Sequence, residues 1–164
     1  MDLQGKRVLV FGTGKSGIGA ADLLEQTGAH VILFDGNENT DKDAVLGKLA
    51  HGEKAEIYAG ELPKEVEAGL DLVVLSPGVP TDIPVVQKFY DMGLPVWGEV
   101  ELAYRTGKGR VLAITGTNGK TTTTALLGKI MSDAEESVFV VGNIGTPYTS
   151  KALEMKPNSV TVAE

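Results

Sequence analysis

The feature that most constrains the fold is a pattern that occurs twice in the chain: a short apolar strand, a glycine-rich loop, and then a helix. The first copy spans residues 6–26 and the second spans residues 110–131. Strands that alternate with helices form parallel sheets joined by right-handed crossovers. The sequence therefore predicts an α/β protein in which each copy opens a parallel sheet of its own.

Further elements are predicted around these two copies. Strands are predicted over 30–34, 55–58, 70–75, 94–97, 137–141 and 160–163, and helices over 41–49, 82–92 and 99–104. Asp82 is predicted to be the N-cap of its helix. The second series has only about three strands, fewer than a typical sheet, and the chain stops at a strand end. We therefore expect a fragment: a Rossmann-like domain over 1–95, then the first part of a P-loop-type α/β domain over 96–164.

Composition excludes several classes of function. The chain has 22 acidic and 15 basic residues, a net charge of −7 and no basic cluster, so we expect no nucleic-acid partner. It has no cysteine, which excludes disulfides and is compatible with a reducing cytosol. No apolar run is long enough to cross a bilayer, and the first residues do not resemble a signal peptide. We expect a cytoplasmic protein with no membrane partner.

The first glycine loop, residues 12–17 (GTGKSG), matches the fingerprint G-x-G-x-x-G between a strand and a helix. In that motif the first glycine permits a tight turn, the second lets a pyrophosphate approach the backbone, and the third lets helix and strand pack closely. Asp35, at the end of the next strand, is a candidate acceptor for a ribose or a base. The loop predicts a nucleoside diphosphate site that fits NAD, FAD or a UDP-sugar. The plain alternative is a Rossmann turn whose glycines serve packing alone.

The second glycine loop, residues 115–120 (TGTNGK), lies between a strand and a helix. The strict P-loop spacing needs a glycine at position 114, where the chain has Ile114. The shorter core keeps the working parts: backbone amides to hold phosphates, Lys120 to reach the β- and γ-phosphates, and the Thr121 hydroxyl for Mg²⁺. The loop predicts a nucleoside triphosphate site. The plain alternative is a glycine turn with a solvated lysine.

Three further residues stand at predicted strand ends, where ligands bind in open parallel sheets. Gly78 lies in the segment SPGVP and Asn143 in the segment GNIG, and for both a structural turn is an equally good explanation. Glu164 ends a strand next to the second glycine loop and is a candidate Mg²⁺ ligand, with a solvated terminal residue as the alternative. His30 and His51 have no partner at motif spacing, and we interpret both as structural or surface residues.

The tandem of two different phosphate loops resembles the Mur ligases, which join amino acids to a UDP-muramyl chain. The family signature G-T-N-G-K-[ST] is present at 116–121, and the loop 142–145 (GNIG) is similar to a second family motif. Three more stretches resemble the D-glutamate-adding branch of the family: 6–17 (KRVLVFGTGKSG), 71–79 (DLVVLSPGV) and 98–102 (GEVEL). The resemblance covers the whole chain.

The resemblance implies an ATP-dependent, ADP-forming ligase that adds D-glutamate to UDP-N-acetylmuramoyl-L-alanine in peptidoglycan synthesis, a process on which cell shape and division depend. Residues 1–95 would bind the UDP-substrate, and 96–164 would bind ATP. The implied substrate-binding residues are Gly14, Lys15, Ser16, Asp35, Gly36, Gly78 and Asn143. The implied ATP-binding residues are Gly116, Thr117, Asn118, Gly119, Lys120, Thr121 and Thr122. The implied Mg²⁺ ligands are Thr121 and Glu164.

The implied reaction is phosphoryl transfer followed by acyl transfer. The substrate carboxylate attacks the γ-phosphate to give an acyl phosphate, and the amine of D-glutamate then displaces phosphate. Lys120 is the implied catalytic residue, because its charge, together with Mg²⁺, stabilises the transferred phosphoryl group. In this family, further metal ligands, the adenine contacts and an amino-acid domain follow the position of Glu164. We therefore expect a monomeric fragment that binds the UDP-substrate and does not catalyse ligation.

Three alternatives stay open. An NAD-dependent oxidoreductase with a Rossmann domain accounts for 12–17 and Asp35, and leaves 116–121 unexplained. A P-loop NTPase of the switch or transporter type accounts for the second loop alone, and the strict P-loop spacing fails there. A non-catalytic UDP-sugar sensor derived from the ligase would differ from the enzyme only in residues after position 164.

Overall fold

A computed structural model describes residues 2–50 and 55–164, so His51 lies outside the described residues. The chain divides into two compact units, Met1–Leu102 and Ala103–Glu164. The division falls within α5 (Glu99–Thr106). The boundary expected from the sequence, between residues 95 and 96, stays a prediction. Each unit is described by itself below.

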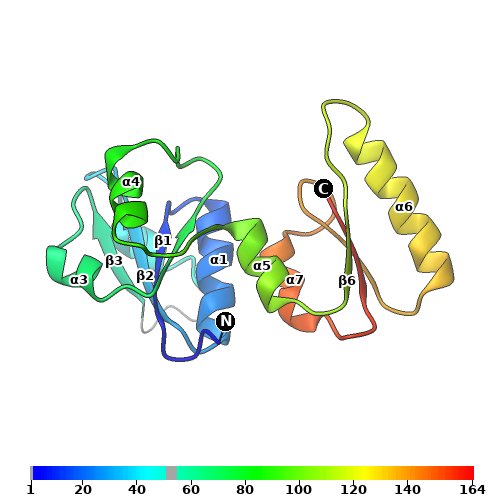
Figure 1. Cartoon of the computed structure of the whole chain (residues 1–164), viewed down its shortest axis with the longest axis horizontal. Helices are drawn as coiled ribbons and strands as arrows, with labels where there is room; N and C mark the ends of the chain where they lie inside the picture. Colours follow the sequence, from blue (N-terminus) through cyan, green and yellow to red (C-terminus); the bar gives the residue numbers. More distant parts are fainter. Residues whose placement is uncertain (1, 51–54) are drawn as a thin grey trace. The chain divides into compact units, whose positions relative to one another are not determined.

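Unit 1 is built on a five-stranded parallel sheet of order β3-β2-β1-β4-β5 (Figure 1). The strands are β1 (Arg7–Phe11), β2 (His30–Asp35), β3 (Glu56–Ala59), β4 (Leu72–Leu75) and β5 (Val96–Gly98). Strands β1, β2 and β4 are almost continuously buried, as expected when helices cover both faces of a parallel sheet. This is the Rossmann-like α/β architecture that the sequence predicts.

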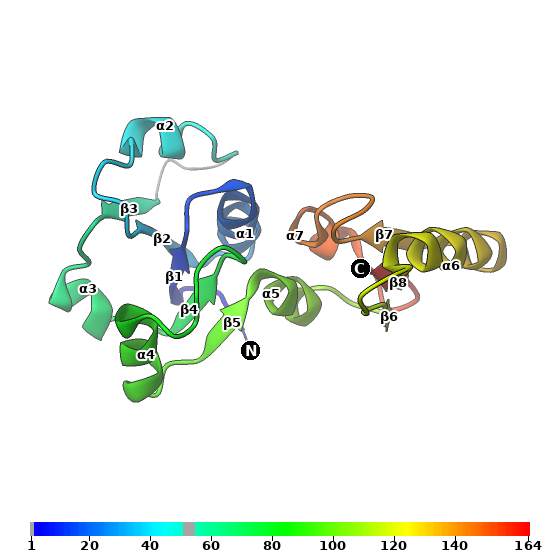
Figure 2. The ribbon, with the colours of Figure 1, turned by 90° about the horizontal axis from the view of Figure 1, so that it is seen from above.

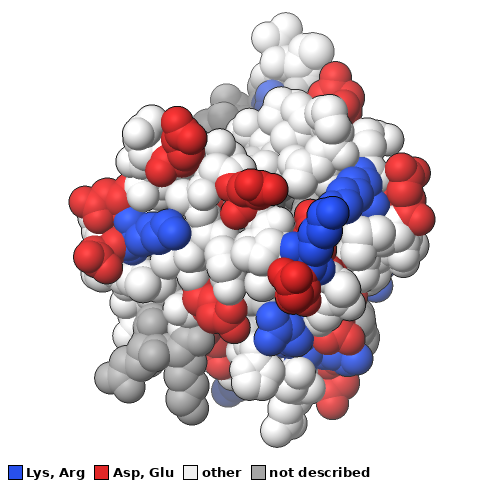
Figure 3. All heavy atoms as spheres, turned by 90° about the vertical axis from the view of Figure 1, so that its left-hand side faces the viewer, with Lys and Arg blue, Asp and Glu red and all other residues white. Residues whose placement is uncertain are grey.

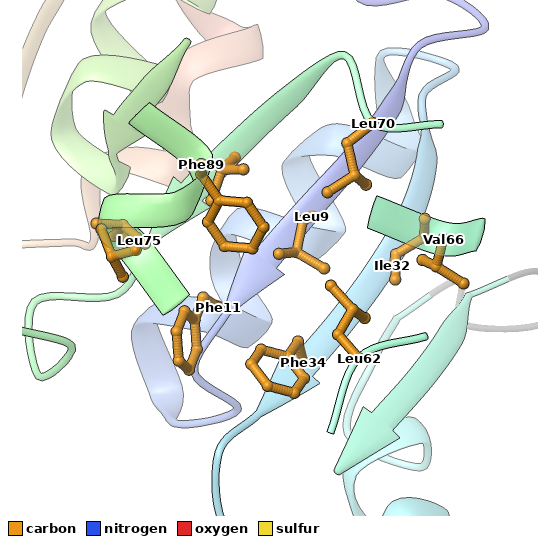
Figure 4. Packing of buried hydrophobic residues seen from close by; sticks show 11 residues of the cluster. Leu9, Phe11, Ile32, Phe34, Leu62, Val66, Leu70, Leu75 and Phe89 are labelled. Atoms are coloured by element: carbon orange, nitrogen blue, oxygen red, sulfur yellow. The ribbon is translucent and has the colours of Figure 1, made fainter. Parts of the chain in front are cut away.

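Helices cover both faces of this sheet (Figure 2). They are α1 (Lys15–Gln26), α2 (Lys42–Leu46), α3 (Lys64–Ala68) and α4 (Pro84–Asp91). Helix α1 packs on β1 and β2 through buried residues such as Ala20 and Leu24. On the opposite face, side chains from α3 and α4 join those of the strands in one apolar cluster (Figure 4). The cluster includes Leu9, Phe11, Ile32, Phe34, Val66, Val73, Leu75 and Phe89.

The strand order reverses at β1, because β2 pairs with it on one side and β4 on the other. In open parallel sheets, ligands bind outside the carboxyl ends of the strands at such a switch point. The chain leaves β1 at Gly12 and β4 at Ser76, so these two residues flank that position. Residues 12–17 and Gly78 therefore lie at the edge of the sheet where a ligand is expected.

Unit 2 is built on a three-stranded parallel sheet of order β6-β8-β7, from β6 (Arg110–Ala113), β7 (Val138–Val141) and β8 (Val160–Ala163). Helix α6 (Lys120–Ala134) packs on one side of it, and α7 (Tyr148–Lys151) and the 3-10 helix η2 (Ala152–Glu154) lie on the other (Figures 1 and 2). A Cβ added at Gly128 of α6 would lie 2.6 Å from Val140 Cγ2, so this glycine permits close packing. The second glycine loop thus connects the end of an outer strand to the helix that covers the sheet.

The eight predicted strands are confirmed, with bounds that differ by at most two residues. Helices α3 and α7 were not predicted; each is too short to show a helical period in the sequence. The prediction of Asp82 as an N-cap is wrong, because Ile83 holds that position. The residue before a proline favours extended backbone, and a proline is favoured in the first turn, so Pro84 sets the start of α4.

The distribution of surface charge bears on how an anionic ligand could be held. On the face shown in Figure 3, acidic and basic side chains are interspersed, so no single sign of charge dominates it. An anion bound there would depend on local backbone groups and single lysines.

None of the described helices combines the length and the apolar character that crossing a membrane requires.

Candidate functional site

The first glycine loop is shaped by two glycines that no other residue could replace without movement. Gly12 has a φ of +102°, and a Cβ there would lie 2.8 Å from the Ser76 hydroxyl oxygen. A Cβ at Gly17 would lie 1.8 Å from the carbonyl oxygen of Gly12. The first glycine therefore permits the turn, and the last lets α1 pack closely against the loop, as the fingerprint requires.

Gly14, the middle glycine, has a different environment. Its φ is −73°, which any residue adopts, and nothing lies within 4 Å of a Cβ added there. Gly14 is the N-cap of α1 and provides no side-chain cap. The first helical hydrogen bond runs from Ile18 N to Gly14 O, at 3.0 Å, so the N–H groups of Lys15 and Ser16 are ones that a helix leaves without an intrahelical partner. This glycine leaves room for a ligand in front of those donors.

The carboxylate of Asp35 is strongly hydrogen-bonded. Its Oδ2 accepts from the Thr13 hydroxyl at 2.5 Å and from the Thr13 N–H at 3.3 Å, and its Oδ1 accepts from the Asn37 N–H at 3.0 Å. Partial burial acts to raise the pKa of Asp35, but these hydrogen bonds outweigh it and lower the pKa below its usual 3.8. Asp35 is therefore held as an anion beside the glycine loop.

The segment after β4 closes the other side of the loop. The Ser76 hydroxyl donates to Gly12 O at 3.3 Å, and Val79 N donates to Ser76 O at 3.0 Å. Gly78, between them in sequence, is exposed, and nothing lies within 4 Å of a Cβ added to it. Gly78 therefore presents its backbone at the switch point, where the sequence analysis expects it.

A pocket of about 290 Å³, which was not predicted from the sequence, is lined by residues at the ends of β1 and β2 and by residues from α3 and α4. Its floor includes the rings of Phe11 and Phe34, whose centroids are 4.7 Å apart (Figure 4). Lys64 and Lys88 contribute to its lining, and Lys88 forms an ion pair with the buried carboxylate of Glu67. The remaining lining residues are Gly36, Gly60, Glu61, Leu62, Ile83 and Val85. The only signal in the sequence is an aromatic residue near the end of each of two neighbouring strands.

The second glycine loop has the backbone of a phosphate cradle. Gly116 has a φ of +140° and Gly119, the N-cap of α6, a φ of +77°, conformations that glycine adopts at little cost. The cap position has no side-chain hydrogen bond, so the first N–H groups of α6 are available to an anion. The ammonium group of Lys120 donates to Gly116 O at 2.8 Å, which folds its side chain back over the loop. Residues 115–119 are exposed.

Thr121 and Glu164 meet at the base of this loop. The Thr121 hydroxyl lies 3.4 Å from Glu164 Oε1, while Glu164 Oε2 is buried without a hydrogen-bond partner among the described residues. Hydroxyl and carboxylate oxygens are the ligands that Mg²⁺ prefers, and this ion commonly keeps several waters and binds substrate phosphates. The pair therefore fits one side of a Mg²⁺ site. Within 2–50 and 55–164 there is no group of three or more His, Cys, Asp or Glu residues that could hold a metal without such additional ligands.

The loop after β7 is held against the same strand end. A Cβ at Gly142, where φ is +113°, would lie 2.3 Å from Glu164 O, and Glu164 N donates to Val141 O at 3.0 Å. Asn143 follows and is exposed. Unit 2 therefore brings Asn143 and Glu164 to the edge at which the second glycine loop begins.

Each unit thus gathers its own predicted residues at the carboxyl ends of its strands. In unit 1 these are Gly14, Lys15, Ser16, Asp35, Gly36 and Gly78. In unit 2 these are residues 116–122, Asn143 and Glu164. The expected roles of these residues in binding, and the approach of Asn143 to a ligand held by unit 1, stay predictions.

Among curated proteins, the chain is 55% identical over 164 residues to the UDP-N-acetylmuramoylalanine--D-glutamate ligase of Lachnospira eligens. It is 53% identical over 164 residues to the protein of the same name from Lachnoclostridium phytofermentans. Each match covers 100% of this chain and 36% of the relative. The chain therefore spans about a third of the length of these relatives.

Solved structures share the fold at lower identity. A murein peptide ligase of Psychrobacter arcticus has a TM-score of 0.54 at 18% identity, with 97% of this chain and 37% of that chain covered. A pseudomurein peptide ligase type C of Methanothermus fervidus has a TM-score of 0.53 at 20% identity, with 97% and 33% covered. Residues 6–98 match the family "Mur ligase MurD-like, N-terminal domain", and 114–164 match "Mur ligase middle domain". The first of these matches covers more than half of the chain, and the chain belongs to the MurD-like Mur ligases.

Proposed function

We propose that this chain provides the UDP-substrate site and the ATP-phosphate site of a ligase that adds D-glutamate to UDP-N-acetylmuramoyl-L-alanine. The observation that carries the proposal is the pair of glycine loops, each at the carboxyl edge of its own parallel sheet and each leading into a helix with an uncapped N-terminus. Such helix starts bind phosphate groups. The relatives that are 55% and 53% identical to the chain carry the name of this ligase.

In unit 1 the diphosphate of the substrate would lie in front of Gly14, where the start of α1 offers its N–H groups and no side chain intervenes. The ammonium group of Lys15 would offset part of the diphosphate charge. The nucleoside would extend toward Asp35 and Gly36, where the pocket with its Phe11 and Phe34 floor has an apolar surface for a planar ring. Gly78 would contact the diphosphate from the β4 side.

In unit 2 the phosphates of ATP would lie on residues 116–122, and Mg²⁺ would be held by Thr121 and Glu164. Mg²⁺ bound there would neutralise charge on the β- and γ-phosphates. Lys120 would leave its present bond with Gly116 O and donate to the transferred phosphoryl group instead. The Gly-Lys-Thr core of the loop, which is typical of nucleoside triphosphate sites, supports ATP, rather than a second diphosphate, as its ligand.

The chemistry balances without a covalent enzyme intermediate. The carboxylate of the muramyl-alanine substrate attacks the γ-phosphorus, the bond to the β-phosphate oxygen breaks, and ADP leaves an acyl phosphate behind. The amine of D-glutamate then attacks the acyl carbon, inorganic phosphate leaves, and the amine loses a proton. Side chains in such a reaction mainly position reactants and stabilise charge.

A nicotinamide-dependent oxidoreductase is less well supported. It would account for residues 12–17 but leaves residues 116–121 and the Thr121–Glu164 pair without a role. The matches to Mur ligase families over both 6–98 and 114–164 also favour the ligase.

Release of ADP tests this proposal. In a protein that continues this chain to the length of its relatives, we expect ADP release over many turnovers only when the UDP-substrate and D-glutamate are both present. Lys120→Met should abolish it, whereas Lys129→Met on the exposed side of α6, where Lys129 pairs with Asp133, is the matched control and should not. The chain alone should bind the UDP-substrate without D-glutamate-dependent ADP release. Equal activity of the Lys120→Met protein would contradict the proposed role of the second loop.

A further inference from the structure

We propose that Thr13 is a positioning residue: it fastens the first glycine loop to Asp35, so that the uncapped start of α1 faces the diphosphate of the substrate. This inference rests on the proposed function, and it assigns a role to a residue that the fingerprint leaves unspecified. It gives Asp35 an anchoring role toward the loop, in addition to its proposed place in the substrate site.

The Asp35 carboxylate is bonded chiefly to Thr13. Both donors of Thr13, its hydroxyl at 2.5 Å and its N–H at 3.3 Å, bond to the same oxygen of Asp35. The Asn37 N–H bonds to the other oxygen. Two of these three donors to the carboxylate therefore come from Thr13, so Asp35 holds the loop mainly through this residue.

Thr13 lies at the point where the loop leads into α1. Only Thr13 and Gly14 lie between Gly12, which follows β1, and Lys15, which begins α1. Gly12 is fixed on both sides, because its N–H donates to Phe34 O at 2.8 Å and its carbonyl accepts from Ser76. Gly14 has no side chain and open space around its Cβ position. Thr13 therefore provides the side-chain tie between the end of β2 and the part of the loop nearest to α1.

The consequence for binding follows from the glycine content of the loop. Glycines leave a loop many conformations, and a ligand that selects one of them must offset the lost entropy. A tie made before binding removes part of that cost, since donors held in place bind more tightly than donors that must be ordered. The Thr13–Asp35 tie thus prepares the loop without itself touching the ligand.

The experiment compares Thr13→Val, which keeps the shape and removes the hydroxyl, with Thr13→Ser, which keeps the hydroxyl. Binding of UDP-N-acetylmuramoyl-L-alanine is measured by calorimetry, and hydrogen–deuterium exchange of the amides of residues 13–17 is measured without ligand. We expect Thr13→Val to weaken binding about tenfold, the effect of losing one hydrogen bond to a charged group, and to speed exchange. Thr13→Ser should restore both, and the thermal midpoint of all variants should stay close to that of the natural chain.

A double-mutant cycle with Asp35→Asn tests whether the two residues act together. If Thr13 acts through Asp35, the loss of affinity in the double variant should be smaller than the sum of the two single losses. Fully additive losses would overturn the inference. Unchanged binding and exchange in Thr13→Val would also overturn it. If the natural chain does not bind the UDP compound, the proposed function fails, while the exchange rates of the free loop still decide whether the tie exists.

Discussion

The hydroxyl of Thr121 lies 3.4 Å from Oε1 of Glu164, and this contact joins the start of α6 to the end of β8. The second carboxylate oxygen of Glu164 is buried and has no hydrogen-bond partner among the described residues. A buried carboxylate oxygen without a donor is costly, and a cation would satisfy it. The pair therefore fits the Mg²⁺ ligands expected beside a triphosphate.

Glu164→Gln tests this fit. The amide keeps the shape of the side chain and can still accept from Thr121, but it lacks the charge that a divalent ion requires. We expect ATP to bind about tenfold more weakly when Mg²⁺ is present, as for loss of one charged interaction. Without Mg²⁺ the natural and variant chains should bind ATP alike. Calorimetric titrations with and without MgCl₂ measure both, and an equal loss in the two conditions would argue against a metal ligand.

Gly17→Ala should destabilise unit 1. The new Cβ would lie 1.8 Å from the backbone oxygen of Gly12, so α1 would have to move away from the loop. Overpacking of this kind costs about 1–3 kcal/mol, and a lower midpoint in urea denaturation is the expected result. A variant with the stability of the natural chain would show that α1 and the loop are not as tightly packed as described.

Gly14→Ala is the matched partner, with the opposite expectation. The backbone of Gly14 suits alanine, and the added methyl meets no atom within 4 Å. The change in unfolding free energy should stay within about 0.5 kcal/mol, as for a surface substitution. Binding of the UDP-substrate should weaken at least about tenfold, because the methyl group would occupy the proposed position of the diphosphate. Unchanged affinity in calorimetry would show that the diphosphate does not bind in front of Gly14.

Asp71 should make the stability of unit 1 depend on acid pH. The Lys6 ammonium donates to Asp71 Oδ1 at 2.8 Å and the Arg7 N–H to Oδ2 at 2.9 Å. These bonds, led by that of Lys6, lower the pKa of Asp71 below its usual 3.8. As the pH falls, the unfolded chain therefore takes up a proton at Asp71 at a higher pH than the folded chain does. The resulting stabilisation is present above the usual pKa and is lost as the pH falls through the lowered one.

The check is urea denaturation of the natural chain and of Asp71→Asn at neutral pH and near pH 3. The two chains should differ most at neutral pH, and the difference should shrink in acid. Asp91→Asn, at an exposed position on α4, is the control and should follow the natural chain at both values. A difference that grows toward acid would contradict the sign of this effect.

Much of the fold could be predicted because strand and glycine signals are local. Buried runs such as that of β4 and the two glycine loops identify the strands, their order along the chain and the edge at which ligands bind. Helices α3 and α7 could not be found, since four or five residues are too few to show a period. The start of α4 was misplaced because Pro84 had more influence than the capping preference of Asp82.

The candidate site could be predicted as a set of positions but not as a set of contacts. Sequence spacing placed Asp35 at the end of β2, yet its bonds to Thr13 depend on how two segments far apart in the sequence come together. The pocket at Phe11 and Phe34 depends in the same way on α3 and α4, which lie far from both rings in the sequence. Contacts between distant segments can be known only from the tertiary structure. They determine which residue binds the ligand and which residue holds another in place.

The most direct test of the account is a calorimetric titration of this chain with UDP-N-acetylmuramoyl-L-alanine, with NADH as the comparison ligand. We expect saturable binding of the UDP compound, weakened by Gly14→Ala, and no binding of NADH. Binding of NADH without binding of the UDP compound would contradict the proposed substrate site and favour a dinucleotide site on the first glycine loop.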